Sequence, residues 1–451
     1  MVVGGDAAGM SAAATAKRRA GDALDVVVVE RTGWTSYSAC GIPYWVAGDV
    51  DGPDGLVART PEQHREKGID ARVGIEAVSV DPAEQAVTVR PCDGGPEERL
   101  GYDHLLLATG AQPVRPDVPG ADADGVHGIQ TLDDGCRLLQ TLESLDDSRP
   151  RRAVVVGGGY IGVEMAEVCL RRGLATTLVD LADEPMSTID PDLATLVRTA
   201  MLDMGIDVVM GAGAEGFDTD DTGRVRAVRA GGRTYDADVV VLGLGVQPRS
   251  ELAAAAGMPL GGSGGIRVEP SMTVPGPAGV WAAGDCVESW DRVAEEFVYV
   301  PLGTHANKQG RIAGLNIAGG RERFHGVVGT AITKVCDLEV ARTGMAQDSA
   351  VAAGFDAVSA TIKTTTRAGY FPGAQPMTVR LTAEKSGGRL LGGQIVGGEG
   401  SAIRIDICAT ALWAGLGVHD LVDLDLAYAP PFSSPWDPVQ VAARALLSEL
   451  H

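Results

Sequence analysis

Residues 153–180, AVVVGGGYIGVEMAEVCLRRGLATTLVD, decide the fold of this chain. An apolar run leads into a turn that holds Gly157, Gly159 and Gly162. A helical segment and a second apolar run follow, and the second run ends in Asp180. Glycines at this spacing let the backbone turn tightly, so that a pyrophosphate can rest on the N-terminus of the helix. The terminal acid accepts hydrogen bonds from a ribose hydroxyl and would repel a 2′-phosphate. The stretch therefore predicts a dinucleotide site for NADH rather than NADPH.

The same order of elements occurs at the start of the chain. The turn at residues 4–9, GGDAAG, keeps Gly4 and Gly9 but has Asp6 in place of the middle glycine. The apolar strand that follows ends in Glu30, the expected ribose-binding acid. Two such units in one chain predict two nucleotide-binding domains.

A remote segment indicates which dinucleotide the first unit binds. Residues 279–285, GVWAAGD, read as a strand that ends in Gly-Asp. This segment resembles the flavin-binding signature of the pyridine nucleotide–disulfide oxidoreductases, in which the acid holds the ribityl chain of FAD. The resemblance implies FAD in the first unit and NADH in the second. The expected FAD residues are Gly4, Gly9, Glu30, Thr109, Gly110 and Asp285, and the expected NAD residues are Gly157, Gly159, Tyr160, Gly162, Asp180 and Gly245.

The chain beyond residue 323 has a different pattern of predicted elements. It alternates strand-like runs with a helical stretch at 403–416, and it carries no nucleotide motif. We therefore expect an α/β fold with two Rossmann-like domains and a C-terminal α+β dimerisation domain. The expected domains are 1–113 with 243–323 for FAD, 114–242 for NAD(P)H, and 324–451 for dimerisation.

Of the seven cysteines, Cys40 departs from the expectation of a buried, inert thiol. No two cysteines lie within 30 residues of each other, so neither a metal site nor a dense disulfide framework is indicated. Cys40 lies in the loop-like segment SYSACGIPY at 36–44, and Pro43 can begin a helix there. A thiol at a helix N-terminus has a lowered pKa and is nucleophilic. A cysteine packed in a tight turn is the alternative interpretation.

The sequence around Cys40 indicates which members of this family the chain resembles most. Residue 35 is Thr35, so the second thiol of a C-x-x-x-x-C pair is absent. The pattern resembles coenzyme A-disulfide reductases and their relatives, the NADH oxidases and NADH peroxidases, and the resemblance covers essentially the whole chain. Ala7 stands where the oxidases and peroxidases carry an active-site His. Residues 425–435, DLAYAPPFSSP, resemble the reductase motif whose tyrosine, here Tyr428, reaches the partner's site, and Tyr370 resembles its second tyrosine.

The resemblance implies NADH-dependent reduction of coenzyme A disulfide, or of a related low-molecular-weight disulfide or persulfide. Cys40 would be the single redox-active thiol, Tyr428 and Tyr370 would assist it, and coenzyme A can be held covalently on Cys40. Two alternatives remain open. An NADH oxidase or peroxidase would cycle Cys40 through a sulfenic acid, and a flavin reductase would pass electrons to a redox protein, with Cys40 merely structural.

Coenzyme A carries a 3′-phospho-ADP group, which requires cations or polar donors. Two basic clusters qualify, although a solvated helix end explains each equally well. The candidate coenzyme A residues are Lys17, Arg18, Arg19, Ser36, Asn307 and Lys308.

Charge and hydropathy exclude other partners. The net charge is −22, which argues against nucleic acid or an anionic membrane as the main partner because like charges repel. No segment reaches the roughly 18 apolar residues of a membrane-spanning helix, and the apolar start lacks the positive region of a signal peptide. We expect a cytoplasmic homodimer that acts on a small molecule and needs no metal.

Overall fold

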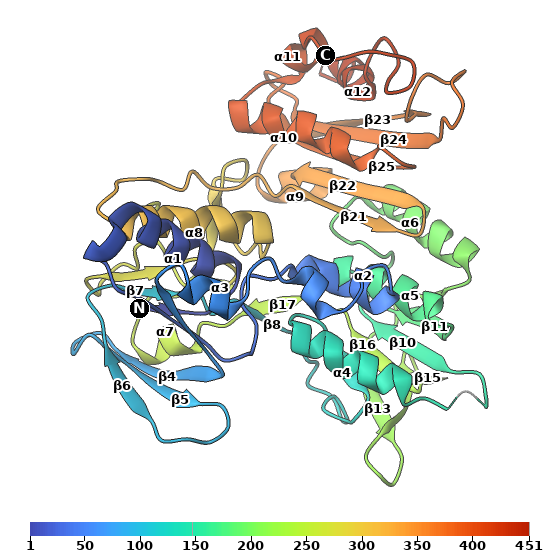
Figure 1. Cartoon of the computed structure of the whole chain (residues 1–451). Coiled ribbons are helices and arrows are strands. Elements are labelled where there is room, and N and C mark those ends of the chain that lie inside the picture. Colours follow the sequence, from blue (N-terminus) through green and yellow to red (C-terminus); the bar gives the residue numbers. More distant parts are fainter. Residues whose placement is uncertain (147, 451) are drawn as a thin grey trace.

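The computed structural model describes residues 1–146 and 148–450, which form three domains (Figure 1). The first domain is built on a parallel sheet of five strands. These are β1 (Val2–Val3), β2 (Val26–Glu30), β3 (Ile69–Val73), β7 (Leu105–Leu107) and β18 (Val280–Ala282). Their order is β18-β7-β1-β2-β3, so the sheet combines the start of the chain with a strand from far downstream.

Two helices distant in sequence lie side by side on this sheet, α1 (Ala7–Ala20) and α8 (Gly303–Ile317) (Figure 1). Their close approach depends on glycine. A Cβ on Gly310 would lie 2.1 Å from the carbonyl oxygen of Ala8, and a Cβ on Gly314 would lie 2.3 Å from that of Ala12. Any larger residue at these two positions would force the helices apart.

The second domain repeats the first. Its strands are β9 (Val126–Gly128), β10 (Arg152–Val156), β11 (Ala175–Val179), β12 (Asp207–Val209) and β16 (Val239–Leu242). All pairs are parallel, in the order β12-β11-β10-β16-β9. The helices are α4 (Leu132–Glu143), α5 (Tyr160–Arg171) and α6 (Pro191–Met204). Residues 153–156 of β10 are all buried, as expected for a strand covered on both faces.

A two-stranded ribbon joins the two nucleotide-binding domains. The chain leaves the first domain along β8 (Ala111–Pro113) and returns along β17 (Val246–Pro248), and these strands pair antiparallel. Each strand contains a Gln-Pro pair, Gln112-Pro113 and Gln247-Pro248, so these matching Gln-Pro exits of the two domains meet in space. The expected domain boundaries at residues 113 and 243 lie at or beside this ribbon.

The third domain is an antiparallel sheet covered by helices. Its strands are β21 (Ala331–Val335), β22 (Leu338–Gly344), β23 (Ala357–Thr365), β24 (Pro376–Glu384) and β25 (Leu390–Gly397), in the order β21-β22-β25-β24-β23. The helices are α9 (Gln347–Ala352), α10 (Ile405–Ala414), α11 (Val418–Asp423) and α12 (Pro438–Leu447). In Figure 1 the hairpin β21–β22 faces the second domain, whereas α11 and α12 lie at the far end of the molecule.

Smaller elements complete the described chain. A three-stranded sheet of β4 (Ile75–Asp81), β5 (Ala86–Pro91) and β6 (Glu98–Gly101) flanks the first domain, and one of β13 (Ala214–Thr219), β14 (Val225–Ala230) and β15 (Arg233–Asp236) flanks the second. The remaining elements are α2 (Ile42–Ala47), α3 (Pro61–Arg65), α7 (Glu251–Ala255), β19 (Ser289–Asp291) and β20 (Glu296–Val298). No helix in the part of the chain that the structure describes has the length and apolar character needed to cross a membrane.

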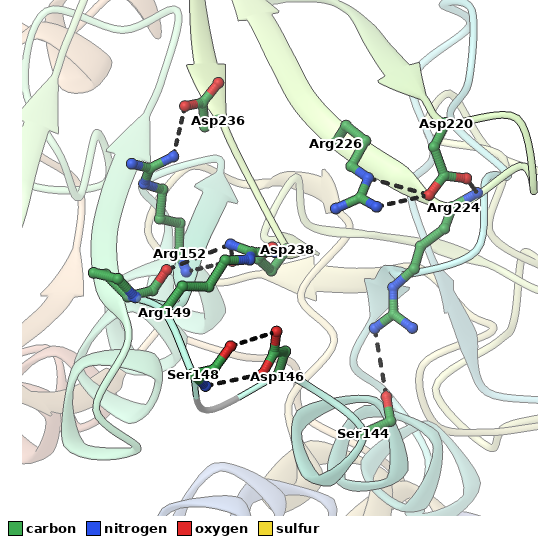
Figure 2. A network of polar contacts seen from close by, with 11 residues as sticks. Ser144, Asp146, Ser148, Arg149, Arg152, Asp220, Arg224, Arg226, Asp236 and Asp238 are labelled. Atoms are coloured by element: carbon green, nitrogen blue, oxygen red, sulfur yellow. Dashed lines mark hydrogen bonds and ion pairs between the residues drawn. The ribbon is translucent and has the colours of Figure 1, made fainter.

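A buried carboxylate fixes the start of β10 (Figure 2). Asp238, directly before β16, accepts hydrogen bonds from the Arg152 amide at 2.9 Å and from both terminal nitrogens of Arg149. Burial alone would raise the pKa of Asp238, but these hydrogen bonds outweigh burial and hold the pKa below its ordinary value. The network sets β10 beside β16 and thereby positions the glycine turn that follows β10.

We predict that Asp238→Asn lowers the free energy of unfolding of the second domain by about 1–3 kcal/mol at pH 7, because a charged acceptor of several hydrogen bonds is lost. Since the folded pKa is lowered, Asp238 contributes stability above the unfolded value near 4 and loses it as the pH falls further. The wild type and the variant should therefore converge in acid. Urea unfolding followed by circular dichroism at pH 7 and at a series of pH values from 4 down to 2 measures both effects.

The matched control is Asp236→Asn, which breaks the neighbouring ion pair of Asp236 with Arg152, drawn in the same view (Figure 2). That pair is mostly exposed, so its loss should cost less than about 1 kcal/mol. Equal losses for the two variants at pH 7 would contradict the role assigned to Asp238.

Candidate active site

One large cavity, of about 2120 Å³, lies where the three domains meet. Both glycine turns contribute to its wall, as does the hairpin β21–β22 of the third domain. The predicted site residues that line it are Gly4, Arg18, Glu30, Ser36, Cys40, Thr109, Gly110, Gly157, Gly159, Tyr160, Asp180, Gly245, Asp285 and Asn307. The predicted residues outside its lining are Gly9, Lys17, Arg19, Gly162, Lys308, Tyr370 and Tyr428.

The first turn is closed by direct contact of backbone with backbone. Gly4 has φ +107°, and a Cβ there would lie 2.0 Å from the carbonyl oxygen of Ala108. A Cβ on Gly9 would lie 1.9 Å from the Gly4 carbonyl oxygen, so Gly9 acts by letting α1 pack on β1 rather than by touching a ligand. Glu30 accepts hydrogen bonds from the amides of Gly5 (2.7 Å) and Thr32 (2.8 Å), which orients its carboxylate at the cavity wall.

The second turn has the same geometry. Gly157 has φ +104°, and a Cβ on Gly162 would lie 1.8 Å from the Gly157 carbonyl oxygen. Asp180 accepts hydrogen bonds from the amides of Gly158 and of Ala182, the latter at 2.7 Å. The acid that ends the second strand is therefore held in the same way in both domains, by the turn and by the residue two positions later.

The first-domain half of the cavity fits FAD. Asp285 follows β18, and burial raises the pKa of its carboxyl to about 6. Tyr299 also lines the cavity, and its hydroxyl is buried and has no hydrogen-bond partner within the described chain. Together with Glu30 and the closed turn, these buried polar groups provide acceptors and a donor for the hydroxyl groups and ring edge of a flavin dinucleotide.

Cys40 lines this cavity. It lies in a short 3₁₀ turn, Ala39–Gly41, directly before α2. The residue has exposed surface toward the cavity, but protein surrounds much of its thiol. The prediction of a lowered thiol pKa is wrong for the protein alone: burial raises the pKa of Cys40, and the carboxylates of Glu164 and Asp285 raise it further.

Glu164 is a cavity residue that the sequence analysis missed. It lies one turn after Tyr160 on α5, and the i, i+4 spacing that puts both on one helix face could have revealed it. Its carboxylate accepts a hydrogen bond from Thr333 of the third domain at 2.6 Å. Burial raises the pKa of Glu164, so it is a candidate proton carrier beside the thiol. Arg342, also of the third domain, donates to the Tyr160 hydroxyl at 3.3 Å.

Only some of the predicted coenzyme A residues line the cavity. Arg18, Ser36 and Asn307 line the cavity, and Arg59 and Arg311, which the prediction did not include, line it too. Of the residues outside the lining, Lys17 instead donates to the carbonyl oxygen of Leu24 at 3.1 Å. His64 lies 3.0 Å from the Ser36 hydroxyl, and burial lowers its pKa to about 4, so the ring is neutral at pH 7.

Tyr370 and Tyr428 lie together, away from the cavity of their own chain. Their exposed fractions are 77% and 47%, and interaction with the Tyr370 side chain raises the pKa of Tyr428. Both belong to the third domain, and the exposed Phe432 follows Tyr428 in the same loop. Within one chain these tyrosines do not reach Cys40.

Comparison with known proteins identifies the family. Residues 1–310 match the model of the pyridine nucleotide-disulphide oxidoreductases, and residues 330–438 match the dimerisation domain of the same proteins. The chain is 34% identical over 100% of its length to a NADH oxidase of Methanocaldococcus jannaschii, covering 99% of that protein. It is 35% identical over 99% of its length to the NAD(P)H coenzyme A polysulfide/persulfide reductase of Pyrococcus horikoshii, covering 98% of that protein.

A solved structure supports the same family assignment. A NAD-dependent persulfide reductase from A. fulgidus is 36% identical, with a TM-score of 0.94, over 99% of this chain and 82% of that one. The predicted family and fold class are confirmed, and FAD and NAD(P)H are the cofactors that this family implies. The chain belongs to the pyridine nucleotide-disulphide oxidoreductase family, with two nucleotide-binding domains followed by a dimerisation domain.

Proposed function

We propose that the protein uses NADH to reduce coenzyme A disulfide, or a related low-molecular-weight disulfide or persulfide, through Cys40. The observation that carries the proposal is that Cys40 is the one cysteine among the described residues that line the shared cavity, and it is exposed there. With a single protein thiol, the second sulfur of the redox-active disulfide has to come from the substrate. In each turnover, one NADH and one proton would provide the two electrons and two protons that convert one disulfide into two thiols.

We assign each group of cavity residues a role in binding a cofactor or in the chemistry of the thiol. The first turn, Glu30 and Asp285 would hold FAD, which when bound supplies the route for two electrons between nicotinamide and thiol. The second turn and Asp180 would hold NADH. The Cys40 thiol has to lose its proton before it can attack a disulfide, and Glu164 is the carboxylate with the strongest influence on it.

A phosphate-bearing thiol such as coenzyme A suits the opening of this cavity. Arg18, Arg59 and Arg311 line it although the chain as a whole carries a charge of −22, and their guanidinium groups could pair with phosphate groups. Ser36 and Asn307 add polar donors. We include in the proposal that coenzyme A can remain on Cys40 as a mixed disulfide.

The names of the relatives support one of the two alternatives, an NADH oxidase. The relative from M. jannaschii is called a NADH oxidase, whereas the relative from P. horikoshii is called a coenzyme A polysulfide/persulfide reductase. Ala7 lines the cavity where the resemblance places the histidine of the oxidases and peroxidases. This difference favours the sulfur substrate. The free cysteines of the described chain also suit the reducing cytoplasm, which we propose as its location.

The second nucleotide site favours NADH. Asp180 lines the cavity with both carboxylate oxygens held by amides. None of the described residues 114–242 that line the cavity is an Arg or a Lys. A 2′-phosphate would therefore meet a fixed negative charge with no cation of the same domain to offset it.

The first prediction is that kcat/KM for NADH exceeds that for NADPH, and that Asp180→Ala narrows the ratio by about tenfold, since one repulsive charge pair is removed. Steady-state kinetics with both nucleotides tests it. Glu30→Ala, the equivalent change in the first turn, should lower FAD content and leave the ratio unchanged. A preference for NADPH in the unaltered protein would overturn the assignment.

The second prediction concerns the thiol. Cys40→Ser should lower the reduction of coenzyme A disulfide by about a thousandfold or more, while reduction of ferricyanide by NADH continues. Cys92→Ser, which alters an exposed cysteine outside the cavity, is the matched control and should change neither activity. Mass spectrometry of the native protein should find coenzyme A on Cys40. Faster turnover with O₂ than with any disulfide would favour the oxidase instead.

The third prediction concerns the dimer. We propose that Tyr428 and Tyr370 serve the Cys40 of the other subunit, since they are exposed on the dimerisation domain. Tyr428→Phe should keep FAD content and oligomeric state and lower disulfide turnover by about one to two orders of magnitude. A hybrid of one Cys40→Ser subunit and one Tyr428→Phe subunit, isolated with two affinity tags, should regain one intact site. Activity no greater than that of the two parent variants would show that the site lies within one chain.

A further inference from the structure

The two glycine turns differ at one position in the cavity wall. Asp6 in the first turn stands where Gly159 stands in the second, and both line the cavity. Both have extended backbone, with φ −111° and −76°, so the conformation itself does not require glycine. Among the described residues, the one atom within 4 Å of a Cβ built on Gly159 is the Gly243 carbonyl oxygen, at 3.8 Å. The position therefore has room for a side chain, and in the first domain a carboxyl occupies it.

This position matters because of what approaches it. In a dinucleotide-binding turn the middle glycine lets the backbone come close to the pyrophosphate. The Asp6 carboxyl would then be a neighbour of a doubly charged anion. Its Oδ1 accepts a hydrogen bond from the Tyr37 amide at 3.0 Å, which ties the side chain to the loop that leads to Cys40.

The groups around Asp6 make the ionised form unfavourable even before an anion arrives. Burial raises the pKa of Asp6 to about 7, the amides of Tyr37 and Ala7 lower it, and the carboxylates of Glu30 and Asp285 raise it. Glu30 comes from the end of β2 and Asp285 from the loop after β18. The other titratable neighbours are the Tyr37 hydroxyl and the Cys40 thiol, whose pKa values are raised in part by the Asp6 charge.

We propose that the protonated carboxyl of Asp6 is a ligand of the bound dinucleotide and donates a hydrogen bond to an oxygen of its pyrophosphate. The inference rests on the assignment of the first turn to FAD made above. A carboxylate next to a pyrophosphate would be repelled, whereas a carboxylic acid turns the same contact into a hydrogen bond. Where Asp6 is ionised in the free protein, binding of FAD takes up one proton from solvent. The first turn thus couples flavin retention to proton uptake, and the second turn does not.

The test is the Kd for FAD as a function of pH. Holoprotein is diluted at pH values from 6.5 to 9, and released FAD is followed by its fluorescence. With Asp6 ionising near pH 7 in the free protein, Kd should rise by up to about tenfold per pH unit above that point. In Asp6→Asn the amide donates at every pH, so Kd should change by less than about twofold over the same range. Asp6→Gly, which copies the second turn, should also give a flat profile.

The reciprocal variant is Gly159→Asp, whose Cβ meets only the Gly243 carbonyl oxygen, at 3.8 Å, among the described residues. It should give the Kd for NADH the pH dependence that the unaltered second turn lacks. A flat profile for FAD in the unaltered protein, or a slope that survives in Asp6→Asn, would overturn the inference while leaving the proposed function intact. A chain that binds no FAD at pH 6.5 would overturn the cofactor assignment as well.

Discussion

The contact between helix and strand backbone at each glycine turn is the constraint on which the rest of the structure depends. Gly9 and Gly162 approach the carbonyl oxygens of Gly4 and Gly157 so closely that even one methyl group would not fit. This approach presents the N-termini of α1 and α5 to the cavity and aligns Glu30 and Asp180 with the turns. The same contact, made twice, gives the chain two sites whose carboxylates are held by equivalent amides. The two sites are therefore alike because one packing solution was used in both domains.

The third domain closes the site that the first two domains form. Its polar contacts with the second domain include Thr333 on Glu164, Arg342 on Tyr160 and Arg380 on Asp190. Asp190 is buried, and Gln394 satisfies both its amide and its carboxylate. A buried acid with all its partners present tolerates little displacement, because losing one partner would leave a charge without compensation. The family's dimerisation domain is thus also part of the wall around the nucleotides.

The wall of the cavity carries both acidic and basic side chains. Glu164, Asp285 and Asp6 act on the Cys40 thiol, whereas Arg18, Arg59 and Arg311 are among the arginines of the cavity wall. Burial, and after it the negative charge of these carboxylates, raises the pKa of Cys40 and so stabilises the protonated thiol. Reactivity would then depend on what binds in the cavity rather than on the thiol alone.

Much of this protein could be predicted from its sequence, because the relevant signals are local. The glycine spacing, the acid at the end of each second strand and the repeated Gln-Pro exits lie within short segments whose backbone requirements are specific to residue type. The single cysteine without a pairing partner also follows from spacing alone. The family, the fold class and the dinucleotide chemistry rest on these signals.

Other features were decided by the tertiary structure, because they depend on neighbours that are far away in the sequence. The pKa of Cys40 could not be predicted from α2, since Glu164 and Asp285 approach it from two other segments. Whether Lys17 or Arg18 faces the cavity depends on rotation about α1, which the sequence cluster does not specify. Asp6 looked like a defect in a glycine motif, and only its burial beside Glu30 and Asp285 gives it a distinct chemistry. Local motifs determine the backbone, whereas charge and proton affinity at a site are sums over everything that the fold brings near it.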